Sequence, residues 1–256
     1  TEHVVYQMRG AIPFDPHIII YRQGVRCMWE IKSCKKTDDS YPKALRMLKS
    51  APDILYYVGD ISILAESTVV AVVGKRDSSE RYLRIAHKIG GKLAENGVTV
   101  LNGLALGCDA QALEGAVEAK GKTVAVMPGG LDEIYPRSNK KLAEQIVAGG
   151  GCLISEYPSG TKPQRYTFVQ RDRIQAMLSS KVFIVDASKD GGTMHTAEYA
   201  LKYQKPLGCF MEEAGEISPS GNQFLIESHQ ACAISDTKDL LAFVGQPEYE
   251  QMSLFG

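Results

Sequence analysis

The sequence predicts an α/β domain with a doubly wound, mostly parallel sheet. From residue 69 onward, short runs of β-branched and other apolar residues alternate with longer segments whose apolar residues recur every three or four positions. Runs such as Val69–Val73 contain no polar residue, as expected of strands covered on both faces. This alternation is typical of βαβ units. A chain of 256 residues is long enough for one such domain with a small N-terminal extension.

The predicted elements follow one another in a regular order. The strand at 69–73 precedes a helix that extends to about Asn96, which Ser78 or Ser79 can cap and Gly97 can end. The apolar face of this helix has helical spacing: Tyr82, Ile85, Ile89 and Leu93. Further strands are predicted at 98–101, 123–127, 152–155, 182–185, 207–210 and, shorter, 231–234. Further helices are predicted at 109–119, 138–147, 165–178, 193–203 and 236–243.

We expect three segments along the chain. Residues 1–40 form the N-terminal extension, in which 18–31 suggest a β-hairpin and 32–40 a polar linker. Residues 41–245 form the core domain, which a short helix at 43–49 and a strand at 54–57 lead into. Residues 246–256 contain little apolar surface, so we expect a flexible tail.

The composition excludes several classes of protein. No apolar run approaches the roughly 20 residues that a bilayer crossing needs, and the N-terminus lacks a secretory signal pattern, so we expect a cytoplasmic protein. The six cysteines include no C-x-x-C pair and the five histidines show no ligand spacing, so we expect no metal. The dinucleotide pattern G-x-G-x-x-G is absent after the first strand, and no other cofactor is indicated.

The charge is unevenly distributed along the chain. The net charge is −1, but residues 1–211 hold 28 of the 29 basic and 22 of the 30 acidic side chains, an excess of six positive charges. Such an excess supports a local basic surface for phosphates. The alternative is an evenly mixed, solvated surface.

Glycine-rich loops follow four of the predicted strands. They span 74–76, 102–109, 128–130 and 190–196, at the sheet edge where parallel α/β proteins bind ligands. Glycine lets backbone N–H groups approach an anion, and the N-termini of the following helices add partial positive charge. Lys75 and Arg76 in the first loop add cationic side chains. The sequence therefore predicts a phosphate-binding edge.

The helix around Phe168 combines arginines with an aromatic ring. Arg171 and Arg173 follow Phe168 closely. Arginines next to rings suit single-stranded nucleic acid, because guanidinium groups bind phosphates while rings stack on bases. The alternative is structural, with Arg171 or Arg173 paired to Glu156 or Asp172.

Eight short motifs occur in a fixed order along residues 41–244. They are Tyr41-Pro42, Tyr57-Val58-Gly59-Asp60, Gly74-Lys75-Arg76, Asn102 to Asp109, Leu131 to Pro136, Ser155-Glu156-Tyr157-Pro158, Phe168 to Ser179, and Gly191-Gly192-Thr193. The ordered set resembles the DNA-processing protein A family, also called Smf. The resemblance implies an extended Rossmann-like fold and a non-enzymatic homodimer that binds and protects single-stranded DNA. It also implies a recombinase as partner, loaded onto DNA during transformation and recombination.

The resemblance and the loop composition together give the residues that we expect to bind DNA phosphates and bases. They are Gly74, Lys75, Arg76, Asn102, Gly103, Lys140, Lys141, Phe168, Arg171, Arg173, Gly192 and Thr193. Three positions depart from the family pattern. Asp172 replaces an asparagine and would repel a phosphate, while Gly191 and Asn102 each replace a serine. The family's terminal modules are not evident, so we expect a variant that consists of the core.

The last residues contain a separate motif. Gln251-Met252-Ser253-Leu254-Phe255 resembles the peptide by which bacterial replication and repair proteins bind the sliding clamp. Leu254 and Phe255 would enter an apolar pocket, and Gln251 would fix the register by hydrogen bonds. The alternatives are a chance match and docking of the tail onto the protein's own core.

Two other functions remain open on the sequence alone. One is a nucleotide-binding enzyme or sensor of the phosphoribohydrolase-like Rossmann group, because Pro128–Glu133 faintly matches the Pro-Gly-Gly loop of that group. The glycine-threonine and the glutamate that follow this loop in that group are missing. The other is a DNA-sensing component of a defence or mobile-element system, which no residue supports.

Overall fold

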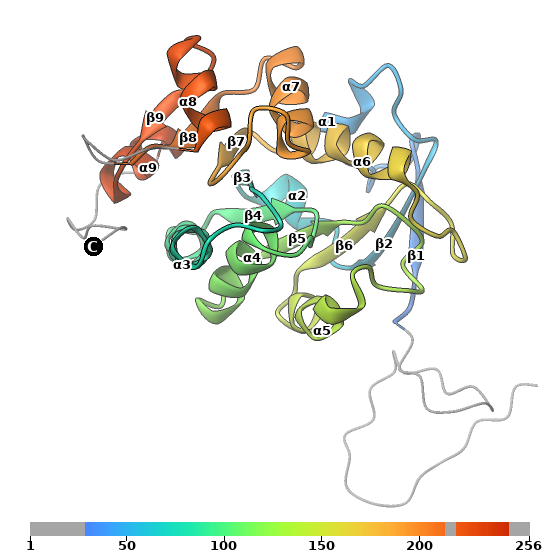
Figure 1. The fold of residues 1–256 in the computed structure, drawn as a ribbon. Helices are drawn as coiled ribbons and strands as arrows, with labels where there is room; N and C mark the ends of the chain where they lie inside the picture. Colours follow the sequence, from blue (N-terminus) through green and yellow to red (C-terminus); the bar gives the residue numbers. More distant parts are fainter. Residues whose placement is uncertain (1–28, 213–218, 246–256) are drawn as a thin grey trace, which may run out of the picture. The chain divides into compact units, whose positions relative to one another are not determined.

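The computed structural model describes residues 29–212 and 219–245 (Figure 1). Within the described part of the chain, the residues from Ile31 onward form one compact unit. The predicted hairpin at 18–31 lies almost wholly outside the described residues. The tail motif with Gln251, Leu254 and Phe255 also lies outside them.

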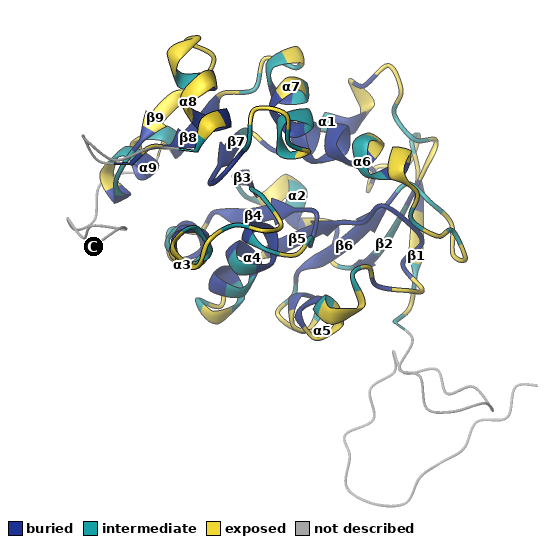
Figure 2. Ribbon diagram, in the orientation of Figure 1, coloured by how far each residue is buried: buried dark blue, intermediate teal, exposed yellow. Residues whose placement is uncertain are grey.

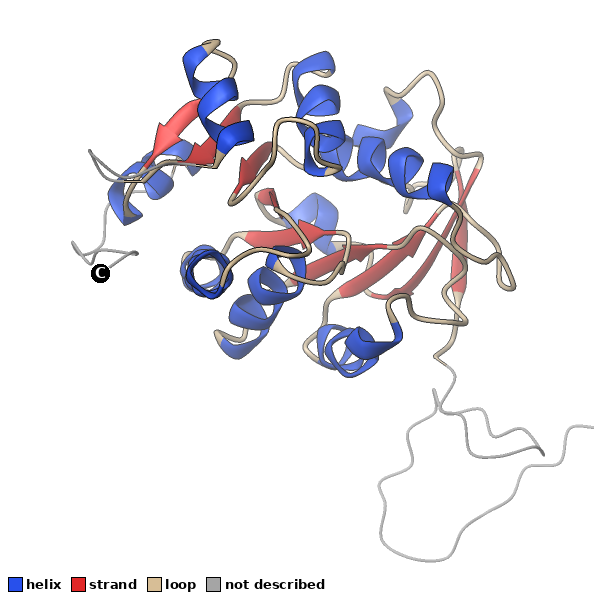
Figure 3. Cartoon of the chain, viewed as in Figure 1, coloured by secondary structure: helices blue, strands red, loops and turns tan. Residues whose placement is uncertain are grey.

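A nine-stranded sheet forms the centre of the described part of the chain (Figure 3). Its order is β1-β2-β6-β5-β4-β3-β7-β8-β9. The strands are β1 Lys32–Lys35, β2 Ile54–Gly59, β3 Val69–Val73, β4 Thr99–Asn102, β5 Thr123–Val126, β6 Cys152–Ser155, β7 Lys181–Ile184, β8 Leu207–Phe210 and β9 Cys232–Ile234. The stretch from β6 to β9 is parallel throughout, which confirms the predicted fold class.

The segment expected to be a polar linker instead contains an edge strand. β1 pairs antiparallel with β2, with Lys32 opposite Tyr57 and Lys35 opposite Ile54. β2 in turn pairs antiparallel with β6. Of the four residues of β1, Cys34 is buried in the core and the others are exposed. An edge strand with a single inward residue has too little apolar pattern to be recognised from sequence.

Helices cover both faces of the sheet. Their bounds are α1 Lys43–Arg46, α2 Ile63–Glu66, α3 Glu80–Glu95, α4 Cys108–Glu118, α5 Lys140–Ala148, α6 Arg165–Leu178, α7 Thr193–Lys202, α8 Ser220–Glu227 and α9 Thr237–Val244. In Figure 1, α3, α4 and α5 lie on one face, and α1, α6 and α7 on the other. Leu45, Ile174 and Ala197 of the second group share a core cluster with the sheet. Figure 2 shows the inner strands, β3 to β8, buried between these layers, while the edge strands β1 and β9 are mostly exposed.

Two short helices were not predicted. α2 and α8 are four and eight residues long, and both follow segments rich in serine, glycine or proline that resemble loops. α8 contributes Leu225 to the core cluster. The remaining predicted helices are confirmed, with ends that differ by at most three residues.

The strand order changes direction at β3. β3 pairs with β4 on one side and with β7 on the other. The chain runs outward from β3 through β4, β5 and β6, and then returns along α6 to start β7 beside β3. Loops that follow β3 and β7 therefore diverge. At such switch points open α/β sheets bind their ligands, at the carboxyl ends of the strands.

No helix within 29–212 and 219–245 has the length and apolar character to cross a bilayer. The same residues contain no group of three or more His, Cys, Asp or Glu side chains placed to hold a metal ion.

Candidate nucleic-acid interface

An arginine and two aromatic rings meet at the carboxyl edge of the sheet. Arg76 lies exposed in the loop after β3, and its Cζ atom is 5.1 Å from the ring centroid of Phe168 in the first turn of α6. Phe168 contacts Tyr135 edge-on, with ring centroids 5.6 Å apart and planes at 65°. Tyr135 is 45% exposed. We call Arg76, Tyr135 and Phe168 the aromatic cluster.

The structure thus brings two of the predicted site residues together and adds a third that was missed. Arg76 and Phe168 were both candidates from the sequence. Tyr135 belongs to the motif 131–136 but was not among them. An exposed tyrosine directly before a proline, within a recognised motif, was the available signal.

The loop after β3 is fixed to its neighbours by backbone contacts. The Lys75 N–H donates to the carbonyl of Asp186 at 2.9 Å, and the Cys108 N–H donates to the carbonyl of Lys75 at 3.1 Å. Gly74 packs so tightly that an added Cβ would lie 2.6 Å from Cβ of Cys108. Lys75 also forms a 3.9 Å ion pair with Asp186. These contacts hold the backbone that presents Arg76.

Asn102 shapes the loop after β4 from inside the protein. Its side chain is fully buried, and its amide nitrogen donates to the carbonyls of Val72 and Asp109 at 3.1 and 2.8 Å. Its Oδ1 accepts the Leu104 N–H at 2.9 Å. Every hydrogen-bonding group of this side chain is therefore engaged within the protein, which explains how asparagine is accommodated where the family has serine.

Arg171 links three elements beneath the surface. It is 5% exposed and donates to the carbonyls of Gly103 and Val126 at 2.8 and 2.9 Å, and to Oδ1 of Asp172 at 2.9 Å. The Gly103 N–H donates in turn to Oδ2 of Asp109 at 3.1 Å. A Cβ on Gly103 would lie 1.7 Å from Nη1 of Arg171, so only glycine fits beside this guanidinium.

Two buried carboxyl groups flank Arg171. Burial raises the pKa of Asp109 to about 6, against the opposing effect of Arg171. Burial also raises the pKa of Asp172, which accepts hydrogen bonds from Arg171 and from the Gln175 amide. Asp172 is 8% exposed, and its carboxyl group is engaged with Arg171 and Gln175 within the protein.

Arg173 also forms an ion pair within the protein. Its two terminal nitrogens donate to Glu156 at 2.9 and 2.7 Å, and one of them donates to the carbonyl of Ser50 at 3.0 Å. The side chain is about nine-tenths buried. The alternative weighed from the sequence, structural pairing of Arg171 with Asp172 and of Arg173 with Glu156, is the arrangement that the structure contains.

The two lysines at the start of α5 are exposed. Lys140 lies 3.8 Å from Glu144 in a surface ion pair, and Lys141 is exposed beside it. The preceding residue, Asn139, donates to the carbonyls of Leu104 and Ala105 at 2.9 and 3.2 Å. These hydrogen bonds fix the start of α5 to the loop after β4, at the carboxyl edge of the sheet.

The last glycine loop leads into α7. Gly192 is exposed with nothing within 4 Å of an added Cβ, and Thr193 begins the helix. The Gly191 N–H donates to the carbonyl of Ser188 at 2.9 Å, which closes the turn. The side chain that the family has at 191 is absent, but the backbone N–H groups at the helix start are in place.

Known proteins resemble this chain over most of its length. The sequence model of the family described as DNA recombination-mediator protein A matches residues 32–245. Protein Smf of Synechocystis sp. is 39% identical over 211 residues, which are 81% of this chain and 52% of that protein. DNA processing protein DprA of Streptococcus pneumoniae is 33% identical over 74% of this chain and 72% of its own length.

Solved structures agree with the sequence comparison. DNA processing protein A from Helicobacter pylori, studied for its single-stranded DNA binding mode, superposes with a TM-score of 0.73 at 33% identity, over 84% of this chain and 94% of that one. The S. pneumoniae DprA structure gives a TM-score of 0.75 at 32% identity, over 83% and 74%. The chain spans about half the length of several relatives, including the Synechocystis protein. With the fold and the family match over residues 32–245 in agreement, the chain belongs to the DNA recombination-mediator protein A family.

Proposed function

We propose that this protein binds single-stranded DNA across the carboxyl edge of its sheet, as a non-enzymatic DNA-processing protein. The observation that carries the proposal is the aromatic cluster, in which an exposed guanidinium lies over one ring and a second, exposed ring meets the first edge-on. An arginine beside aromatic rings matches the alternation of phosphates and bases in a single strand.

The exposed residues provide the contacts in this proposal. Arg76 binds a phosphate, while Phe168 and Tyr135 stack on bases. Lys140 and Lys141 extend the cationic surface along the start of α5. Gly192 and Thr193 offer backbone N–H groups at the start of α7.

The buried candidates position those contacts. Arg171 fixes the loop that contains Gly103, and Arg173 fixes the middle of α6 to Glu156, the residue after β6. Asn102 holds the loop after β4 in place, and Gly74 allows the close packing of the loop after β3. We therefore expect substitutions of these residues to act first on stability and through it on DNA affinity.

A direct binding measurement tests this function. Fluorescence anisotropy of labelled oligo-dT and of matching duplex DNA, at about 50 and about 200 mM salt, gives affinity, strand preference and salt dependence together. We expect salt-sensitive binding that prefers the single strand. No binding of oligo-dT at the lower salt concentration would overturn the proposal.

We further propose that the protein assists a recombinase in coating single-stranded DNA during transformation or recombination, in the cytoplasm. The family match and the names of the relatives support this role. The test is filament assembly by the purified recombinase of the same organism on DNA that single-strand-binding protein already covers. The addition of this protein should increase the assembly rate, and an unchanged rate would contradict the role.

Two partners complete the proposal. A second copy of the chain is expected in a homodimer, which light scattering after size-exclusion chromatography tests by mass. The tail motif with Gln251, Leu254 and Phe255 is expected to bind the sliding clamp. Replacement of Leu254 and Phe255 by alanine should abolish clamp binding in calorimetry and leave oligo-dT binding unchanged.

A further inference from the structure

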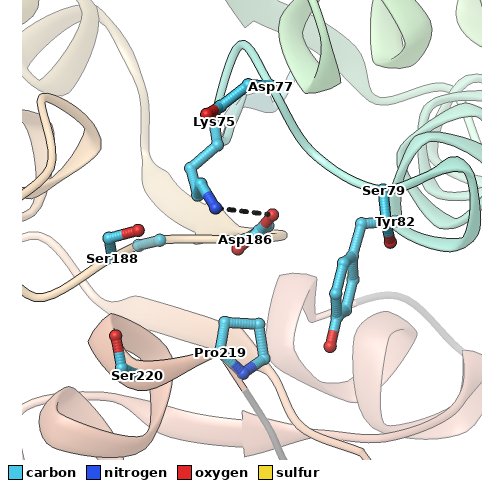
Figure 4. A pocket seen from close by; sticks show the side chains of 9 residues that line it. Lys75, Asp77, Ser79, Tyr82, Asp186, Ser188, Pro219 and Ser220 are labelled. Atoms are coloured by element: carbon cyan, nitrogen blue, oxygen red, sulfur yellow. Dashed lines mark ion pairs between the residues drawn. The ribbon is translucent and has the colours of Figure 1, made fainter.

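Besides the aromatic cluster, the structure contains a pocket large enough for a small ligand, at the switch point between β3 and β7. A pocket of about 490 Å³ opens between the loop after β3, the start of α3, the loop after β7 and the start of α8 (Figure 4). Its lining includes Lys75, Ser79, Tyr82, Asp186, Pro219 and Ser220. This volume falls in the range of roughly 300–1,000 Å³ that small-molecule sites occupy. None of the aromatic cluster lines it.

The pocket places a cation beside a buried carboxylate. Lys75 Nζ lies 3.9 Å from Oδ2 of Asp186, a long separation that leaves the ammonium able to bind a further acceptor. Asp186 is 4% exposed and accepts the Ser78 hydroxyl at 2.7 Å. A ligand with an anionic group next to a hydroxyl group satisfies both, because the anion pairs with Lys75 while the hydroxyl donates to Asp186.

The remaining walls combine hydroxyl groups and apolar surface with a second carboxyl group, that of Asp77. In Figure 4, Lys75 reaches toward Asp186 between Tyr82 on one side and Ser188 and Ser220 on the other. The Ser79 hydroxyl makes no capping bond to α3, and Ser79 lines the pocket. The ring of Tyr82 offers a stacking surface for a planar group.

We propose that this pocket binds a nucleoside monophosphate, either free or as the phosphorylated end of a DNA strand. Its phosphate pairs with Lys75 and the base lies against Tyr82. In a free nucleotide, a sugar hydroxyl also donates to Asp186, whereas the 3′-oxygen of a strand end is esterified and has no proton to donate. The free-nucleotide site is independent of the DNA-binding proposal. The strand-end version rests on it, because the loop after β3 carries both Lys75 in the pocket and Arg76 in the aromatic cluster.

Calorimetry on the full chain tests the site with AMP and dTMP, and with adenosine, thymidine and inorganic phosphate as comparisons. At least one nucleotide should bind about tenfold or more tighter than its nucleoside and than phosphate. Ser220→Phe places a ring in the pocket from the exposed start of α8 and should abolish nucleotide binding. Gln223→Phe, at an exposed position of the same helix outside the pocket, is the matched control and should leave binding unchanged.

Lys75→Gln gives a second, independent measurement. It should reduce nucleotide affinity to the level of the nucleoside, because the cation that pairs with the phosphate is lost. The proposal is overturned if neither nucleotide binds more tightly than its nucleoside, or if folded Ser220→Phe binds as the parent does. A retained preference for the phosphate in Lys75→Gln would also overturn it.

The two sources of the nucleotide are distinguished with oligo-dT. If strand ends are bound, a 5′-phosphate should increase oligo-dT affinity, and Ser220→Phe should remove that increase alone. If free nucleotide is bound, the 5′-phosphate has no effect and AMP or dTMP binds as above. Arg76→Glu should lose oligo-dT binding and keep nucleotide binding, so failure of the DNA-binding proposal and failure of this one give different results.

Discussion

The guanidinium of Arg76 lies over the ring of Phe168, with 5.1 Å between Cζ and the ring centroid. The two residues come from the loop after β3 and the first turn of α6, which the sheet order brings to one edge. The pair places a positive charge, which can bind a phosphate, next to an aromatic ring, which can stack on a base. Each partner can be removed separately, so the two contributions can be measured apart.

Phe168→Ala should weaken oligo-dT binding without changing its salt dependence. Loss of a stacked base costs about 1–3 kcal/mol, and no cation is removed. Anisotropy across a salt titration measures both quantities. Tyr166→Ala, in the same helical turn and 60% exposed but outside the aromatic cluster, is the control. An equal loss in both variants would contradict stacking on Phe168.

Tyr135→Ala should also weaken oligo-dT binding without changing its salt dependence, by less than Phe168→Ala does. Tyr135 is 45% exposed, so its ring is available to a base, and its edge contact also steadies Phe168. The affinity for oligo-dT should fall by about 1 kcal/mol or more with an unchanged salt slope. Unaltered affinity would remove Tyr135 from the interface.

Gly103→Ala should destabilise the fold strongly, because its Cβ would lie 1.7 Å from Nη1 of Arg171. We expect a loss of several kcal/mol, about 3 or more, in urea unfolding, since the buried guanidinium must leave its carbonyl partners. Gly192→Ala is the matched control, with nothing within 4 Å of the added Cβ and a φ of −60°. It should stay within about 1 kcal/mol of the parent. Similar losses in both would refute the crowding argument.

Arg171→Met should cost about 3–5 kcal/mol of stability, because Asp109 and Asp172 would lose the buried cation between them. Urea unfolding measures the loss. Arg84→Met, on the exposed side of α3, should change stability by no more than about 0.5 kcal/mol. A loss below about 1 kcal/mol for Arg171→Met would show that its hydrogen bonds contribute little net stability.

Asp109 should make stability depend on pH. Burial raises its pKa from 3.8 to about 6 in the folded protein, so the folded state favours the neutral carboxyl. The associated stability is full below pH 3.8 and falls as the pH rises through about 6. Relative to Asp109→Asn, which does not titrate, the parent should lose up to about 3 kcal/mol between about pH 4 and about pH 8. A pH-independent difference in the free energy of unfolding would contradict this assignment.

The sheet and most helices could be predicted because their patterns are local. Val69–Val73 is apolar throughout and lies in the middle of the sheet, while α6 has the predicted bounds 165–178. β1 could not be predicted, because only Cys34 of its residues faces the core. Its position depends on pairing with β2, and the residues of a polar segment alone do not show which strand it will pair with.

The candidate site was predicted as an edge of the sheet, without the placement of its individual residues. The sequence shows that Arg76 follows a strand and that Arg171 and Arg173 lie within a helix. It does not show which of the three side chains are buried. Arg171 and Arg173 are held by carbonyls and carboxylates from distant strands, and those partners appear only in the folded chain. Tyr135 was missed for the same reason, since its contact with Phe168 is tertiary.

The most direct test of the central claim compares two charge reversals. Arg76→Glu removes the cation of the aromatic cluster, while Lys120→Glu makes the same charge change at the exposed turn between α4 and β5, at the opposite edge of the sheet. In anisotropy with labelled oligo-dT, Arg76→Glu should abolish binding and Lys120→Glu should bind nearly as the parent does. Parent-like binding by Arg76→Glu, or an equal loss in both variants, would show that the single strand does not lie over the aromatic cluster.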